Sequence, residues 1–195
     1  MNPKTLFDFH SYLFALTEKN KLARTHAFYP CYCSGISYLE EMLSNSRNHK
    51  AFVCLTDTSE DSTTRKSGGW FKRRVFTVFI LCRYNTRSQD DYREKLGICR
   101  ELFRQLHSRF LIDEHDLHLL DVNRRASSQP DARSASQAGA GNRASVNNEL
   151  AYLDVENIRS RELGGQFLNG CTGLYFMLAI DEPVDLQYDK DEWNE

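Results

Sequence analysis

The sequence has no long hydrophobic run, and this absence limits where the protein can work. The longest nearly apolar stretches, Val75–Cys82 and Gly173–Ile180, fall far short of the roughly 20 residues that a helix needs to cross a bilayer. No transmembrane helix is therefore predicted. The start, Met1–His10, lacks a basic region followed by an unbroken apolar one, so no secretory signal is expected. We expect a protein that stays in a cytoplasm.

The chain also has no large excess of charge of one sign. It carries 25 basic and 27 acidic residues, a formal net charge of -2. Such a balance gives no overall field that would drive non-specific binding to nucleic acid or anionic lipid. Partners must therefore be recognised by local surfaces.

The cysteines lack the spacing of a metal site or of a disulfide framework. Cys31 and Cys33 form a C-x-C, which is too close for an ordinary structural disulfide and has no second pair to complete a zinc ribbon. The other cysteines lie in apolar patterns, where a free thiol behaves as a small buried hydrophobic side chain. We expect all of them to be reduced. These others are Cys54, Cys82, Cys99 and Cys171.

What is present suffices for one core. Hydrophobic residues make up 41% of the 195 residues and aromatic ones 12%. The mean hydropathy of -0.58 must then reflect polar segments concentrated in a few places. The sequence predicts a single α+β domain over residues 1–195, with a flexible insertion at 123–148 and an extended acidic tail at 181–195.

Helices are predicted from apolar residues spaced three and four apart. The first begins with Asn2 as N-cap and Pro3 in the first turn, and ends around Lys19–Lys21. A short helix follows, with Ser37 and Glu40 in the capping-box relation. The best-specified helix starts at Ser88, with Asp91 completing its cap, and its single apolar face suits packing across a sheet. That face consists of Tyr92, Leu96, Cys99, Phe103, Leu106 and Phe110.

Strands are predicted where apolar residues are β-branched or aromatic. Ala51–Leu55 and Trp70–Tyr84 form an antiparallel hairpin, joined by a long polar turn, Thr56–Gly69. Further strands are predicted at His118–Val122, Tyr152–Ile158 and Leu174–Ile180. The expected fold is a small antiparallel or mixed sheet, covered by the long amphipathic helix and an N-terminal helix. One core is expected to contain Val75, Val78, Ile80, Leu96, Cys99, Phe103, Leu106 and Phe176.

Catalytic and metal-binding patterns are weak. His115 and His118 lie among carboxylates, but no glutamate separates them as in zinc proteases, so a solvated helix end is favoured. No cysteine has a local signature of a Cys–His nucleophile. Gly164–Gly165 and Gly170–Gly173 are interpreted as turns because strands, not helices, follow them. We predict no enzyme, no metal and no cofactor.

A basic-aromatic segment, residues 65–74, is the clearest surface motif. Its cations surround Trp70 and Phe71, a composition that suits contact with nucleic acid. The acidic remainder of the chain argues against that, and a protein-contact loop is favoured. The arginines of the insertion are expected to fork onto carboxylates of a partner. The predicted partner-binding residues are Arg65, Lys66, Trp70, Lys72, Arg73, Arg124, Arg125, Arg133, Arg143 and Trp193.

The element order at Arg73–Arg83, Ser88–Phe110 and Tyr152–Ile180 resembles that of the tail-terminator and tail-completion proteins of tailed bacteriophages. Gly173–Ile180 is similar to the last long strand of phage neck and tail proteins. The resemblance implies a virion structural subunit that forms a ring, usually a hexamer, and contacts tail-tube and neck or connector proteins. It also implies assembly in the host cytoplasm.

Two other classes of function remain open. The runner-up is a nucleic-acid-binding accessory protein that uses residues 65–74. The third is an enzyme whose site is assembled from residues far apart in the chain.

Overall fold

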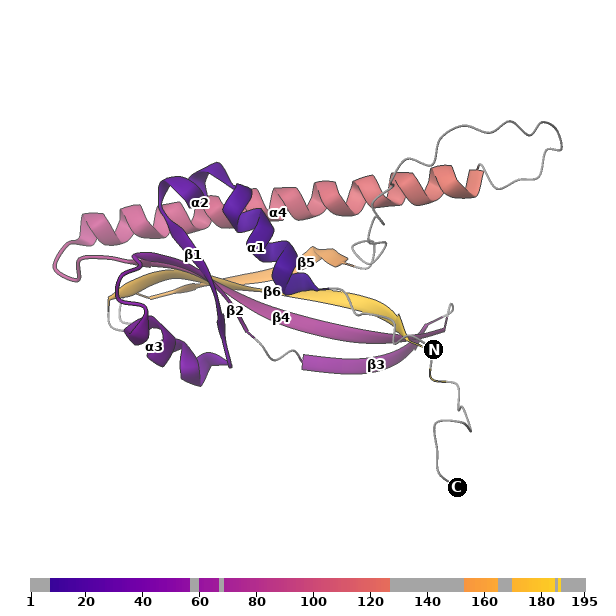
Figure 1. Cartoon of the computed structure of the whole chain (residues 1–195), viewed down its shortest axis with the longest axis horizontal. Coiled ribbons are helices and arrows are strands. Elements are labelled where there is room, and N and C mark those ends of the chain that lie inside the picture. Colours follow the sequence, from indigo (N-terminus) through magenta and orange to yellow (C-terminus); the bar gives the residue numbers. More distant parts are fainter. Residues whose placement is uncertain are drawn as a thin grey trace, which may run out of the picture.

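The computed structural model, shown in Figure 1, describes residues 8–56, 60–66, 69–126, 153–164, 170–184 and 186. For residues 36, 37, 60 and 116–126 it describes the backbone alone. The fold is α+β, as the sequence predicts. Its elements follow in the order α1 (Phe9–Lys19), α2 (Lys21–Thr25), β1 (Phe28–Cys33), α3 (Ile36–Asn45), β2 (Ala51–Thr56), β3 (Glu60–Lys66), β4 (Gly69–Arg83), α4 (Gln89–Ala126), β5 (Leu153–Leu163) and β6 (Cys171–Val184).

One mixed, six-stranded sheet organises the molecule. The main strand order is β1-β2-β4-β6-β5, and β3 pairs with the first half of β4. β1 runs parallel to β2, and the other pairs are antiparallel. The long pair β4 and β6 is in register from Trp70↔Val184 to Arg83↔Cys171. The predicted pairing of β2 with β4 is therefore confirmed, with β6 on the other side of β4.

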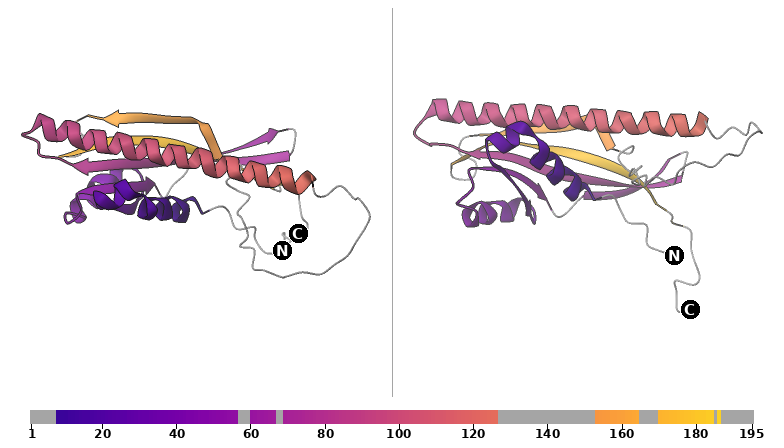
Figure 2. Two further views of the ribbon diagram at one scale, coloured as in Figure 1. Left: turned by 90° about the horizontal axis from the view of Figure 1, so that it is seen from above. Right: turned by 45° about the horizontal axis from the view of Figure 1, so that its top comes forward.

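The two faces of β4 carry two separate cores, because successive side chains of a strand point to opposite faces. Phe76, Val78 and Ile80 join the larger core, beneath α1, α2 and α4. Phe79 and Leu81 join the smaller core with α3, which lies across the sheet from α4 (Figure 2). The near-continuous apolar run of β4 reflects this burial on both faces.

The predicted core is only partly correct. Val78, Ile80, Cys99, Leu106 and Phe176 lie in the larger core, and Phe103 packs against it half-buried. Leu96 is buried but lies outside both core clusters. Val75 is half-buried on the opposite face, because it is an odd number of positions from Val78.

α4 follows its predicted pattern at the start. Ser88 Oγ accepts the Asp91 N–H at 3.2 Å, so the predicted cap is confirmed. Leu102, which the sequence analysis did not select, is fully buried beside Cys99 and Leu106. α4 is 38 residues long and continues to Ala126, so the predicted strand at His118–Val122 is wrong.

The N-terminal elements begin at other residues than predicted. α1 begins at Phe9, where Asp8 Oδ1 accepts the Ser11 N–H at 3.0 Å. The predicted start at Asn2 and Pro3 lies outside the described residues. α3 has Gly35 as its N-cap, two residues before the predicted cap Ser37, whose side chain lies outside the described part of the structure. Tyr12 Oη donates to Asp113 at 2.7 Å and joins α1 to α4.

Three polar or short segments are strands that the sequence did not predict as such. β1 was not predicted. β3 occupies half of the predicted turn Thr56–Gly69, and Asp181–Val184 belong to β6 rather than to a tail. β1 buries Phe28, Cys31 and Cys33 and pairs with β2. β3 and Asp181–Val184 are instead held by pairing with Gly69–Val75 of β4 rather than by a hydrophobic pattern of their own. No helix in the described part of the chain is long and apolar enough to cross a bilayer.

Candidate functional site

The predicted basic-aromatic segment lies on a three-stranded projection, which we call the arm. The arm consists of β3, Gly69–Val75 of β4 and Asp181–Val184 of β6. It leaves the sheet at the end opposite α3 (Figure 1). Every described side chain of β3 is exposed, and Trp70 is 43% exposed opposite Arg65. The arm therefore has little core of its own.

On one face of the arm, basic side chains are paired with carboxylates of neighbouring strands. Arg73 donates to Asp154 on β5 at 2.6 Å and to both carboxylate oxygens of Asp181 on β6 at 3.1 and 3.2 Å. Lys66 reaches the same Asp181 at 2.7 Å. The hydrogen bond to Asp154 is the main reason that the pKa of Arg73 is raised. These residues form a connected network across the strands.

The carboxylate of Asp154 is held in its charged form. Its partial burial acts to raise the pKa, but hydrogen bonds from Arg73 and Asn157 outweigh that effect and lower it. Asn157 lies on the same strand and donates at 2.9 Å. Asp154 is therefore ionised near neutral pH and can hold Arg73 in place.

The other face of the arm carries a second pair, which is largely buried. Arg74 donates to Glu182 at 2.9 Å, and the two side chains are only 12% and 5% exposed. The Arg74 guanidinium also lies over the Phe76 ring, 4.7 Å from its centroid. Lys72 pairs with Asp61 on β3 at 3.0 Å. Such pairs fix the register of strands that have few apolar contacts.

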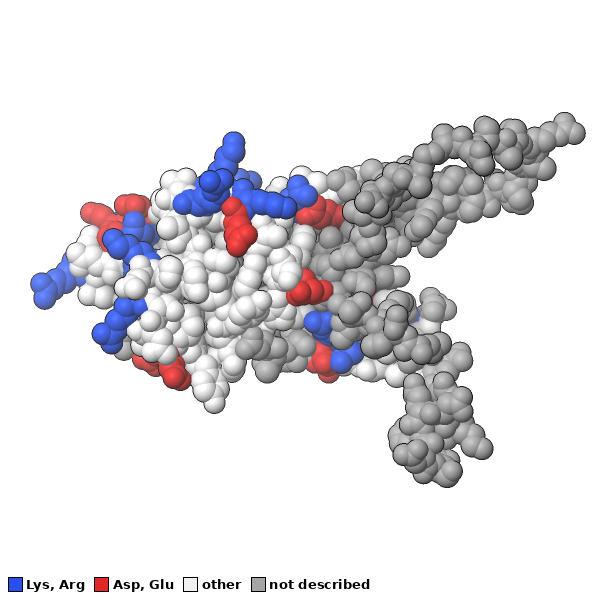
Figure 3. All heavy atoms as spheres, in the orientation of Figure 1, with Lys and Arg blue, Asp and Glu red and all other residues white. Residues whose placement is uncertain are grey.

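This pairing changes the interpretation of the basic segment. Four of its cations, Lys66, Lys72, Arg73 and Arg74, face carboxylates of the same chain. Binding to nucleic acid requires lysine and arginine side chains that can neutralise phosphates and so release the counterions condensed on them. The alternative of a nucleic-acid-binding protein therefore has less support than the composition of residues 65–74 indicates. In Figure 3, basic and acidic side chains are interspersed on the visible face of the described residues.

The remaining predicted partner-binding residues have no described side chains. Arg124 and Arg125 belong to the last turn of α4, where only the backbone is described. Arg133, Arg143 and Trp193 lie outside the described residues, as do most of the predicted insertion and tail. Their proposed contacts stay predictions.

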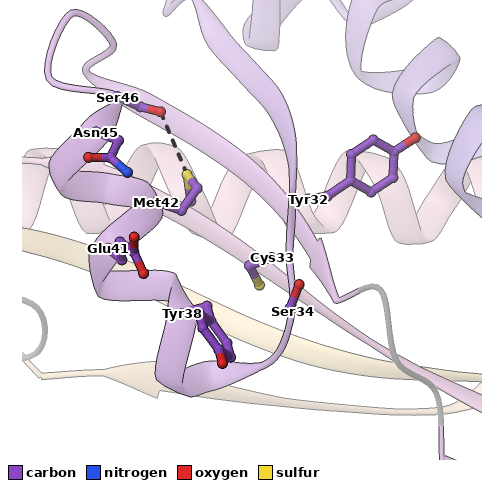
Figure 4. Close-up of a pocket in the computed structure, with 8 residues that line it drawn as sticks. All are labelled: Tyr32, Cys33, Ser34, Tyr38, Glu41, Met42, Asn45 and Ser46. Carbon is purple, nitrogen blue, oxygen red and sulfur yellow. Dashed lines mark hydrogen bonds between the residues drawn. The ribbon is translucent and has the colours of Figure 1, made fainter.

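A hollow of about 320 Å³ lies between α3 and the end of β1. Figure 4 shows that Tyr38, Met42 and Cys33 border it, whereas the Tyr32 ring points away toward another helix. That ring lies 4.7 Å from Phe14 of α1. The lining combines the thiol of Cys33 with the carboxylate of Glu41 and contains no histidine, so it lacks the Cys–His pair of a typical thiol nucleophile.

All six cysteines are free and buried. Cys99 Sγ lies 3.5 Å from Cys82 Sγ, between α4 and β4. Contact with Cys31 and Cys33 is the main cause that raises the pKa of Cys54. Among the described residues, no group of at least three metal-ligating side chains could hold a metal ion.

A second surface, which the sequence did not predict, lies on the sheet face that carries α3. We call it the open face and define it by Thr77, Arg159, Arg161, Tyr175 and Met177. Met177 on β6 pairs with Thr77 on β4 and with Arg159 on β5. Two residues along β6 on the same face, Tyr175 pairs with Arg161. Both arginines are exposed, and the other three are half-buried. Among the described helices, α3 alone lies on this face, and it covers the other end.

Comparison of the chain with models of protein families, with curated proteins and with solved structures found no match. The arm, α4 and the open face are therefore the features that bear on function.

Proposed function

We propose that this protein is a structural subunit that self-associates into a larger assembly. Following the resemblance of its sequence, we assign it to the ring-forming tail terminators or neck–tail connectors of bacteriophage virions. The observation that carries the proposal is the exposed arm. Two- and three-stranded ribbons are only marginally stable in water without a core to pack on. A neighbouring subunit would supply the missing contact.

The end of α4 supports the same proposal. α4 and the arm project from the same end of the molecule and lie apart from each other (Figure 1). Beyond its last core residue, Phe110, the helix exposes Leu111 by 43% and Ile112 by 49%. Leu111 and Ile112 on α4 and Trp70 on the arm thus form two separate exposed apolar spots, which a neighbouring subunit would cover.

A ring is the expected form of such an assembly. When the surface that projects from one copy docks on a different surface of the next, the contact is head-to-tail and closes into a ring if the rotation permits. The arm and the open face are different surfaces of this chain, so they can serve as the two sides of such a contact. The tail tube and the neck proteins are then the expected further partners.

Sedimentation velocity of the full chain over a wide concentration range tests the proposal. We expect the mean sedimentation coefficient to rise with concentration toward that of a closed oligomer, and ring-shaped particles by electron microscopy. Trp70→Asp combined with Leu111→Asp should weaken the association. Tyr38→Asp is the matched control, because Tyr38 is 57% exposed but lies on α3. A monomer at every concentration would contradict the proposal.

A further inference from the structure

The open face carries positive charge that the described part of the chain does not neutralise. Arg73 and Lys66 on the neighbouring arm face Asp154 and Asp181. Arg159 and Arg161, by contrast, have no carboxylate within ion-pair distance among the described residues. Two exposed guanidinium groups at alternate positions of one strand lie on the same side, and each can donate two parallel hydrogen bonds to a carboxylate. This arrangement suits an extended acidic segment.

The register shows that both arginines belong to this face. Glu162, between Arg161 and Leu163, points to the other face, where Arg100 of α4 holds it in a two-pronged pair at 2.7 and 2.8 Å. Leu163 points back and packs in the smaller core beneath α3. Because strand side chains alternate, Arg161 and Arg159 lie on the same side as Leu163.

The part of the open face between these arginines and the centre of the sheet is partly apolar. Tyr175 and Met177 are half-buried, and Tyr175 lies 5.7 Å from Phe79 in a tilted ring contact. A phenol ring and a thioether next to charged forks can hold an aromatic side chain of a bound segment. The face therefore matches a peptide that combines carboxylates with aromatic residues.

We propose that the open face binds the acidic segment 185–195 of a neighbouring copy of this chain. This segment contains five carboxylate residues, one lysine, and the aromatic residues Tyr188 and Trp193. Its composition is complementary to the open face in both charge and apolar content. It directly follows Val184, at the end of the arm on β6, so an arm that reaches a neighbour carries the segment toward that neighbour. The inference rests on the proposed self-association.

A peptide of residues 185–195, carrying a fluorescent label, provides a direct test against the full chain. We expect saturable binding by fluorescence anisotropy that weakens as salt is added. Arg159→Glu with Arg161→Glu should weaken it roughly tenfold or more, because charge-assisted hydrogen bonds are lost. Arg87→Glu with Arg93→Glu changes the net charge equally at exposed positions away from this face and should leave binding unchanged. Circular dichroism checks that each variant is folded.

Sedimentation of the same variants separates the two proposals. We expect Arg159→Glu with Arg161→Glu to weaken self-association, and a copy with Asp189→Lys, Asp191→Lys and Glu192→Lys to restore it on mixing. Undiminished self-association of the arginine variant, or equal peptide binding by it, would overturn the inference and leave the proposed function standing. If the chain stays monomeric yet binds the peptide through both arginines, the proposed function fails, and docking between neighbouring copies fails with it, because no second copy supplies the segment.

Discussion

Arg73 Nη2 donates a hydrogen bond of 2.6 Å to Asp154 Oδ2, and this bond joins β4 to β5 across the intervening strand β6. The two residues are 81 positions apart in the sequence. The same guanidinium holds Asp181 on β6, so one side chain ties three strands together where the arm leaves the core.

Asp154→Asn should lower the free energy of unfolding by about 1 kcal/mol, since the partly exposed pair loses a charge-assisted hydrogen bond. The pKa of Asp154 is lower in the folded chain than in the unfolded chain, where it is about 4. The carboxylate therefore stabilises the folded state fully above about pH 4, and this stabilisation is lost as the pH falls through the folded pKa. Urea unfolding at pH 7 and at acidic pH measures this. The gap between wild type and variant should shrink at acidic pH, while the exposed control Glu156→Gln stays close to wild type at both.

Leu106→Ala should cost about 2–5 kcal/mol of unfolding free energy, because a fully packed side chain would leave a cavity between α4 and the sheet. Leu111→Ala, on the exposed side of the same helix, should change stability by less than about 0.5 kcal/mol. Thermal and chemical unfolding measure both. An unchanged midpoint for Leu106→Ala would refute the packing of α4 on this sheet.

Gly173→Ala should destabilise the fold by about 3 kcal/mol. Gly173 has φ +152°, and a Cβ there would overlap the Ile80 carbonyl oxygen on β4. Both backbone strain and steric overlap therefore oppose a side chain. Gly97→Ala on α4 is the control, because its Cβ would meet open space. Gly97→Ala should stabilise the helix by about 0.5–1 kcal/mol. Equal effects of the two substitutions on the unfolding free energy, measured by denaturant titration, would contradict the register of β4 and β6.

The cysteines should be unreactive in the native protein. Burial raises the pKa of Cys171, and the neighbouring thiol of Cys82 raises the pKa of Cys99 further above the ordinary thiol range. Because the thiolate is the reactive form, a thiol reagent at pH 8 should modify none of the six cysteines in the folded chain and all six in denaturant. Mass spectrometry would locate any cysteine that reacts rapidly in the native protein, and such a cysteine would not be buried as described.

The residue pattern by itself determined several elements whose side chains face a core, although not β1. β2 and the second half of β4 carry near-continuous apolar runs, the first half of α4 carries apolar residues at the helix period, and the Ser88 cap is local to its helix. Such signals depend only on neighbours within a few positions, so they can be read without the fold.

Tertiary structure alone decided the polar strands and the pairing of the charges. β3 has every described side chain exposed and thus no hydrophobic period; its pairing with β4 makes it a strand. The basic segment looked like a free cationic surface, because its partners Asp154, Asp181 and Glu182 come from strands far along the chain.

The open face was hidden for a related reason. Asp154 and Arg159 are an odd number of positions apart, so strict alternation would place them on opposite faces of β5. The irregularity between them shifts the register, so that Asp154 pairs with Ala179 and Arg159 with Met177, which lie on one face of β6. Pairing between strands fixes such a shift, so only the folded sheet brings Arg159 and Arg161 beside Met177 and Tyr175.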